Sequence, residues 1–122
     1  MGHYAYELKE ATSFINKKDF NTVLEKIKEE VKTPKWSCYG WRNSVLKAET
    51  LEDFAKEFNI QLVEEENDNY RPEINDVYVS NFFRYLIEII APYMTNGEIN
   101  INDEYDDVLI VFENGISNVY RL

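Results

Sequence analysis

One strongly apolar helix dominates this 122-residue sequence and determines how the remaining segments can pack. Residues 80–93 are predicted to be helical, because large apolar side chains recur at helical spacing over more than half of the circumference. Only Asn81, Arg84 and Glu88 occupy clearly solvent-facing positions, and Pro92 helps to end the helix. Such a broad apolar surface needs cover on several sides, so we expect this to be the central helix of the core. Its apolar positions are Val79, Phe82, Phe83, Leu86, Ile87, Ile89, Ile90 and Tyr93.

Two amphipathic helices are predicted earlier in the chain. In residues 20–31 the apolar side chains share one helical face, and Thr33–Pro34 ends the helix because the residue before proline disfavours the helical conformation. Thr50 and Asp53 form a capping box that opens a shorter helix, and Asn59 closes it. The two apolar faces are Phe20, Val23, Leu24, Ile27 and Val31, and Leu51, Phe54, Ala55 and Phe58.

Strands are predicted around these helices. Loose alternation of large apolar residues predicts one extended strand over residues 3–15. Residues 33–48 are expected to be irregular or short-stranded, and residues 64–72 to form a polar turn. Short extended segments are predicted over residues 60–63 and 77–79.

The C-terminal third of the chain predicts a β-meander. Residues 98–101 alternate as a half-buried strand, and residues 108–112 form an apolar run that predicts a fully buried one. Asn114–Gly115 supplies the positive φ angles of a type I′ turn into a last strand, residues 116–122. The resulting order, β-α-α-β-α-β-β-β, predicts a single α+β domain over residues 1–122, with an antiparallel sheet whose meander packs on the central helix.

The charge of the chain excludes some partners. It holds 13 Lys and Arg against 23 Asp and Glu, a net charge of −10, which opposes direct binding to nucleic-acid phosphates. Residues 1–48 carry nine basic and six acidic residues, whereas residues 49–122 carry four and seventeen. No signal peptide or membrane span is visible, and the lone Cys38 excludes an internal disulfide, so we expect a protein of the host-cell cytoplasm.

Residues that support catalysis or metal binding are scarce. His3 and Cys38 are the only residues of their types, and nothing in the sequence brings them together. Residues 102–107 are rich in oxygen ligands, but an EF-hand register fails because Tyr105 and Val108 stand where a ligand and a glycine are required. A solvated turn is favoured there over weak divalent-cation binding. We expect no enzyme activity, no cofactor and no metal site.

Two acidic clusters suggest a binding surface. Both flank predicted strands near one end of the sheet, so we expect them to merge into one negative face. Such a face would steer a basic partner and could occupy a groove meant for nucleic acid. An equally favoured interpretation is that these carboxylates are ordinary surface charge that keeps the protein in solution. The expected acidic face consists of Glu64, Glu65, Glu66, Asp68, Asp103, Glu104, Asp106 and Asp107.

An aromatic loop, residues 36–42, is a second candidate for binding a partner or a nucleotide-like ligand. Exposed Trp and Tyr beside Arg are typical of interface hot spots. The alternative, that loop tryptophans cover an edge of the core, is favoured. The aromatic candidates are Trp36, Tyr39, Trp41 and Arg42, with Tyr70 as a lesser one.

The C-terminal half resembles a family of small bacterial and phage proteins. Ala91-Pro92-Tyr93, Asn96-Gly97 and Phe112-Glu113-Asn114-Gly115 are similar to the family's closing pattern "APY…NG…FENG". Family members often carry a Gly-Glu-Asp-type turn and a tryptophan-bearing strand where this chain has residues 103–107 and 109–111. The resemblance implies an α+β fold and an accessory role on mobile genetic elements, and it carries over no catalytic residues.

Together these features predict a non-catalytic acidic binding protein encoded by a phage or mobile element. We expect it to inhibit a basic host protein of defence or nucleic-acid handling, as anti-CRISPR proteins do, by protein binding or nucleic-acid mimicry. The alternatives are an immunity protein that neutralises a cognate toxin and a small nucleotide-ligand binder. No direct nucleic-acid or membrane contact is expected. If the last strand lies at a sheet edge, apolar Val119 and Leu122 could pair it with a second copy as a homodimer.

Overall fold

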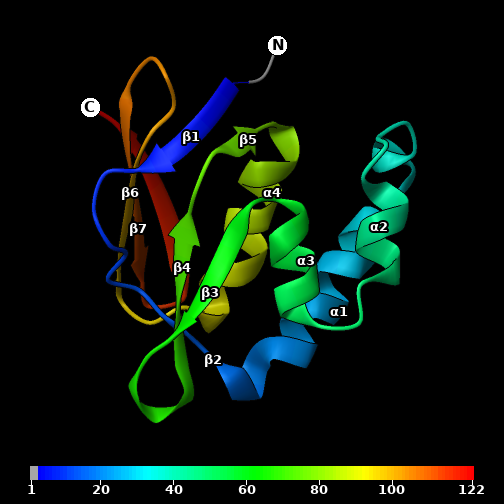
Figure 1. Cartoon of the computed structure of the whole chain (residues 1–122), viewed down its shortest axis with the longest axis horizontal. Helices are drawn as coiled ribbons and strands as arrows, with labels where there is room; N and C mark the ends of the chain where they lie inside the picture. The colour runs from blue at the N-terminus through cyan, green and yellow to red at the C-terminus, as the bar shows by residue number, and fades with distance from the viewer. Residues whose placement is uncertain (1–2) are drawn as a thin grey trace.

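Residues 3–122, which a computed structural model describes, form two antiparallel β-sheets and four α-helices (Figure 1). The larger sheet has the strand order β5-β1-β6-β7-β8, and the smaller sheet has the order β2-β4-β3. The larger sheet consists of β1 (His3–Glu7), β5 (Val77–Val79), β6 (Gly97–Asn102), β7 (Asp107–Glu113) and β8 (Ile116–Arg121). The smaller sheet consists of β2 (Ile15–Asn16), β3 (Ile60–Glu64) and β4 (Asn69–Ile74).

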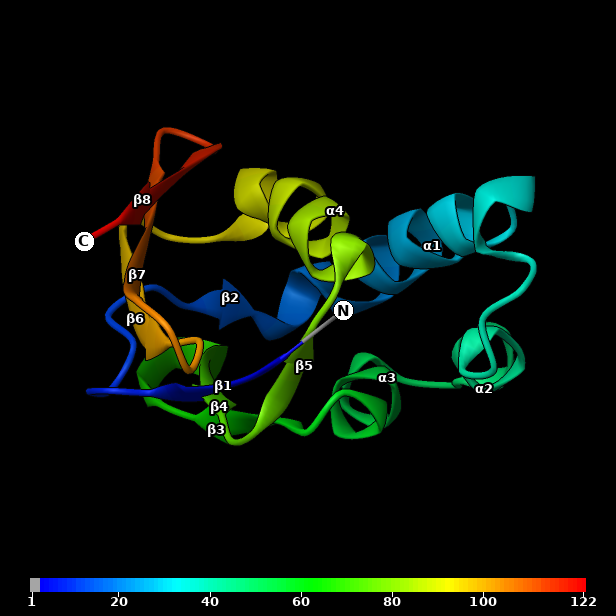
Figure 2. The same cartoon turned by 90° about the horizontal axis from the view of Figure 1, so that it is seen from above.

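Helix α4 (Asn81–Ile90) lies between the larger sheet and α1 (Phe20–Val31), as Figure 2 shows. Helices α2 (Arg42–Lys47) and α3 (Leu51–Glu57) complete the helical layer on the same side of the sheet. No helix of the described residues covers the opposite face. The burial of α4 confirms the prediction of a central core helix. Its buried side chains are Phe82, Phe83, Leu86 and Ile87.

The structure confirms the predicted α+β fold and its C-terminal meander. Strands β6, β7 and β8 pair in sequence order, and their inner side chains face α4. Asn114 and Gly115, which join β7 to β8, have φ angles of 53° and 80°. Two successive positive φ angles are what a type I′ hairpin turn requires. The described helices include none that is long and apolar enough to cross a bilayer.

Two of the strand predictions are wrong, one in extent and one in burial. Residues 3–15 form two strands in different sheets, β1 and β2, because the chain crosses from the larger to the smaller sheet between them. Strand β7 is half-buried rather than fully buried: Leu109 and Val111 point to the uncovered face of the sheet. An apolar run therefore does not require cover on both faces.

Two segments predicted to lack regular structure are ordered elements. Residues 33–48 contain a 3₁₀ turn, Pro34–Trp36, and helix α2 instead of short strands. The predicted polar turn 64–72 contains most of β4, the central strand of the smaller sheet. Pro72 is tolerated there because β2 pairs only with Asn69 and Tyr70, which leaves no strand opposite the proline nitrogen on that side.

The cap of helix α3 gives the first testable prediction. The Thr50 hydroxyl accepts a hydrogen bond of 3.0 Å from the Asp53 amide, as the capping box predicts. Replacing Thr50 by alanine is expected to lower the free energy of unfolding by about 1 kcal/mol, because one amide of the first turn loses its acceptor. Urea denaturation measures this. Thr22→Ala, the same change at an exposed site inside α1, should have a much smaller effect; equal losses would contradict a capping role.

Candidate functional site

The two acidic clusters do not form one face, which corrects the prediction. Glu64, Glu65, Glu66 and Asp68 surround the β3–β4 turn, whereas the other cluster occupies the β6–β7 turn. Figure 1 shows these turns at opposite ends of the molecule, because the two hairpins belong to different sheets and point in opposite directions. A single negative surface over all eight residues is therefore ruled out, and each cluster must be considered alone.

Within the β6–β7 turn, Asp103 is structural. Its side chain is only 1% exposed and accepts hydrogen bonds from the backbone amides of Tyr105 and Asp106. It also pairs with Arg121 on β8, at 2.7 Å between Nη1 and Oδ2. The hydrogen bond to Asp103 is the main cause of the raised pKa of Arg121; Asp106, 3.1 Å away, contributes as well. Asp103 therefore ties this turn to the last strand and is not available to a partner.

The aromatic loop forms an edge of the core, as the favoured alternative predicts. Trp36 is 2% exposed, and its ring contacts Tyr39, Trp41, Phe82 and Tyr85 at centroid distances of 5.1–5.9 Å. The indole N–H donates to the Glu30 carboxylate. Because the indole ring is already packed on several sides, it is not open to a stacking ligand.

The remaining candidates of this group also make internal contacts. Arg42 donates from Nε to the Val31 carbonyl and from Nη2 to the Lys32 carbonyl, and so satisfies the C-terminal end of α1. Tyr70, expected at the surface, is buried against Phe20, with ring centroids 5.0 Å apart. It lies in the part of β4 that the sequence predicted as a turn.

A groove of about 460 Å³ lies between the 3₁₀ turn Pro34–Trp36 and α4, next to the aromatic loop. The Lys35 ammonium lies over the Tyr85 ring there, 4.1 Å from its centroid. The hydrogen bond to Tyr85, followed by the interaction with Glu30, raises the pKa of Lys35. The lysine therefore already occupies the aromatic surface that a nucleotide base would need.

The outer face of the larger sheet carries several large, exposed side chains. The strand register aligns Leu8, Asn100, Leu109 and Tyr120 in one row across four strands. Beside this row, Tyr6 lies opposite Asn102, and the rings of Tyr4 and Tyr78 are in edge contact, 5.3 Å apart. We call these outward residues the tyrosine face: Tyr4, Tyr6, Leu8, Tyr78, Asn100, Asn102, Leu109 and Tyr120.

Solvent exposure distinguishes the tyrosine face from an ordinary sheet surface. An antiparallel sheet with one solvated face normally carries polar residues there. Here the four tyrosines remain between 45% and 51% exposed, and Leu8 is similarly open. Half-exposed tyrosines grouped on a rigid sheet supply large contact area and hydroxyl groups at low entropic cost, as in the core of many protein interfaces.

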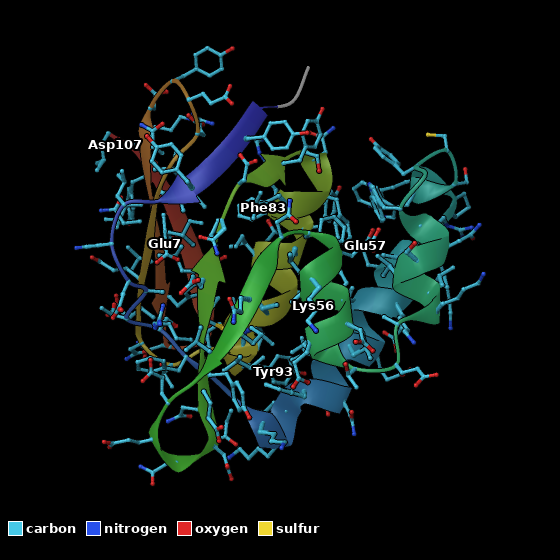
Figure 3. All side chains as sticks on the ribbon, viewed as in Figure 1. Glu7, Lys56, Glu57, Phe83, Tyr93 and Asp107 are labelled. Atoms are coloured by element: carbon cyan, nitrogen blue, oxygen red, sulfur yellow. The ribbon has the colours of Figure 1, made fainter. Side chains whose placement is uncertain are left out.

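Carboxylates border the tyrosine face at the β6–β7 turn. Glu104 accepts a hydrogen bond from the Tyr4 amide at 3.4 Å, which brings the β6–β7 turn against β1. Asp107, labelled in Figure 3, accepts one from the Asn102 side chain at 2.9 Å. The neighbouring cation Lys9 is neutralised by Glu98, 3.1 Å away. The surroundings of the face are therefore negative, and they suit a partner that brings Arg or Lys.

Comparison with known proteins adds no assignment to this surface. The chain matches no protein-family model, no curated protein and no solved structure. Among residues 3–122, no group of three or more His, Cys, Asp or Glu side chains is placed to hold a metal ion. Glu104 and Asp107 are among the candidates that the sequence predicts, whereas the tyrosines are not, although the alternation of Tyr4, Tyr6 and Leu8 is visible in the sequence.

Proposed function

We propose that this protein is a non-catalytic binding protein that attaches through its tyrosine face to a basic surface of another protein. One observation carries the proposal: half-exposed tyrosines on an uncovered sheet face are bordered by Glu104 and Asp107. Arginine suits such a surface because its guanidinium stacks on aromatic rings and pairs with carboxylates. The net charge of −10 would accelerate encounter with that partner.

The target class we propose is a host protein of defence or nucleic-acid handling, which this protein inhibits by covering its basic surface. Proteins that bind nucleic acid carry Lys- and Arg-rich surfaces for phosphate contacts. An acidic protein with rigid tyrosines can cover such a surface through charge and ring stacking together. The resemblance to small phage and bacterial proteins agrees with a role against a host protein.

Two charge-reversal variants test where the partner binds. Glu104→Lys/Asp107→Lys changes the border of the tyrosine face, and Glu64→Lys/Glu66→Lys makes the same net change at the opposite end of the molecule. Proteins captured from host lysate by the wild type are identified by mass spectrometry, purified and titrated against both variants. We expect about 100-fold weaker binding for the first variant and a loss below about fivefold for the second, because only the first places like charge in the contact.

The outcomes separate contact from general attraction. Equal losses for both variants would show that only net charge matters, and would overturn binding at the tyrosine face. Unchanged affinity of the first variant would do the same. Capture of acidic proteins alone would contradict a basic partner. Circular dichroism confirms that each variant is folded before it is compared.

A further inference from the structure

Strand β8 is an open edge of the larger sheet. It pairs with β7 on one side and has no neighbour among the described residues on the other. The Leu122 amide donates to the Asp107 carbonyl at 2.9 Å, so the alternation of an antiparallel ladder turns the backbone groups of Ser117, Val119 and Arg121 away from β7. These three residues present N–H and C=O groups to a further strand.

The usual protection of edge strands is weak on β8. It contains no proline and no lysine, and its only charged side chain, Arg121, is neutralised by Asp103 and Asp106. Its apolar side chains are well exposed: Ile116, Val119, Tyr120 and the following Leu122 range from 51% to 71%. The opposite edge, β5, is only three residues long. Of the two edges, β8 is therefore the one prepared for pairing.

A groove lies next to this edge, between β8 and α4. It has a volume of about 470 Å³ and an apolar lining that includes Phe83, Ile87 and Val119. Arg84 and Glu88 stand on its α4 side, and neither makes an ion pair within the described part of the chain. The sheet thus ends before it covers α4 completely.

The sequence of β8 is complementary to itself. Consider an antiparallel pair of two copies centred on Val119. The residues whose backbone groups point away from β7 then lie opposite one another: Val119 faces Val119, and Ser117 faces Arg121. On the other side of the strands Ile116 meets Leu122, and Asn118 meets Tyr120. Ile116–Leu122 and Val119–Val119 are apolar pairs, and no like charges are opposite each other.

Charge also favours this pairing, although the whole chain carries −10. β8 has no carboxylate side chain of its own, and the two carboxylates that reach it, Asp103 and Asp106, are paired with Arg121. A two-fold axis through Val119 and normal to the sheet makes the two α4 helices antiparallel. Arg84 and Glu88, which make no ion pair within residues 3–122, both line the groove beside β8, so each copy brings one cation and one anion to this side of the contact.

We propose that two copies of this chain pair antiparallel through β8, with Val119 on the two-fold axis, to form a dimer with a continuous ten-stranded sheet. The larger sheet of each copy supplies five of these strands. The two tyrosine faces then lie on the same side of one sheet. This proposal does not depend on which partner the tyrosine face binds.

A charge swap at Val119 tests the dimer, because a residue on the axis faces its own copy. Val119→Lys and Val119→Glu should each weaken dimerisation by about 100-fold, since like charges then stand directly opposite in the ladder. An equimolar mixture of the two variants should form a heterodimer, because Lys then faces Glu. Analytical ultracentrifugation of the full chain at about 1–200 µM measures dimerisation of the wild type, of each variant and of the mixture.

The controls make the result decisive. Asn43→Lys, a change at an exposed position on α2, should dimerise as strongly as the wild type. Slow amide exchange at Ser117, Val119 and Arg121 in the wild type, but not in Val119→Lys, would support pairing at β8. A monomeric wild type across the whole range would overturn the proposal, and so would single variants that remain dimeric or a mixture that stays monomeric. Thermal unfolding followed by circular dichroism shows that each variant is folded.

Discussion

Trp36→Ala is expected to lower the free energy of unfolding by about 3–5 kcal/mol, the range for removing a large buried aromatic side chain. Trp36 is fully enclosed and touches rings from the loop itself and from α4. The alanine variant would leave a cavity between these elements and would remove the donor to Glu30. Equilibrium denaturation in urea measures the loss.

A matched aromatic residue makes this prediction specific. Tyr105 lies in the β6–β7 turn and is 74% exposed, so Tyr105→Ala should cost less than about 0.5 kcal/mol. Trp36→Phe, which keeps a ring but loses the indole N–H, should fall between the two. A loss below about 1 kcal/mol for Trp36→Ala, together with impaired partner binding, would instead restore the aromatic loop as an interface.

Gly97→Ala is expected to destabilise the fold by about 3 kcal/mol, the upper part of the range for overpacked sites. Gly97 begins β6 directly beneath the segment that links β1 to β2. An added Cβ would lie 2.6 Å from the Thr12 carbonyl carbon, 2.8 Å from the Ser13 nitrogen and closer still to the Thr12 carbonyl oxygen. Because these atoms belong to the backbone, a rotamer change cannot relieve the clash.

The displacement would also break hydrogen bonds. Two hydrogen bonds of 2.9 Å join Thr12 and Glu98. The Thr12 amide donates to the Glu98 carbonyl, and the Glu98 amide donates to the Thr12 hydroxyl. Gly40→Ala is the control: no atom lies within 4 Å of its added Cβ, so it should be neutral or stabilise by up to about 1 kcal/mol. Thermal and urea unfolding of both variants test the contrast. A Gly97→Ala protein as stable as Gly40→Ala would contradict the packing of Thr12 on β6.

The sequence predicts those elements whose own residues determine them. The apolar faces of α1 and α4, the Thr50 cap and the Asn114–Gly115 turn depend on local spacing or on a backbone angle. Strand β4 escaped prediction because its sequence is largely polar and one of its two partners, β2, is more than 50 positions away. Arg71 and Pro72 resemble a turn, but Arg71 is buried in β4.

Arg71 shows why a polar segment can be internal. Burial opposes its charge, but the hydrogen bond to Glu65 and the charges of Glu10, Glu65 and Glu7 raise its pKa. Its Nε lies 3.1 Å from Glu65. These carboxylates come from the N-terminal segment as well as from the β3–β4 hairpin, so their grouping around Arg71 depends on the tertiary fold.

The tyrosine face was missed for a different reason. Period-two alternation shows that Tyr4, Tyr6 and Leu8 share one side of a strand, but it does not say which side is inside. The natural interpretation places large apolar residues in the core. In the structure the small Ala5 faces inward, because β1 packs closely there, and the tyrosines face outward. Only the tertiary arrangement separates a core face from a binding face.

The position of β1 in the sheet has a kinetic consequence. β1 lies between β5 and β6, and its partners come about 70 or more positions later, with His3 opposite Val79 and Tyr6 opposite Asn102. During synthesis β1 therefore stays unpaired until β5 and β6 have been made, when most of the chain has left the ribosome. Closing so long a loop early in folding is entropically costly, and such topologies fold in milliseconds to seconds. For that interval the tyrosines of β1 are displayed on an unpaired strand, which is when this chain is most exposed to aggregation and to chaperones.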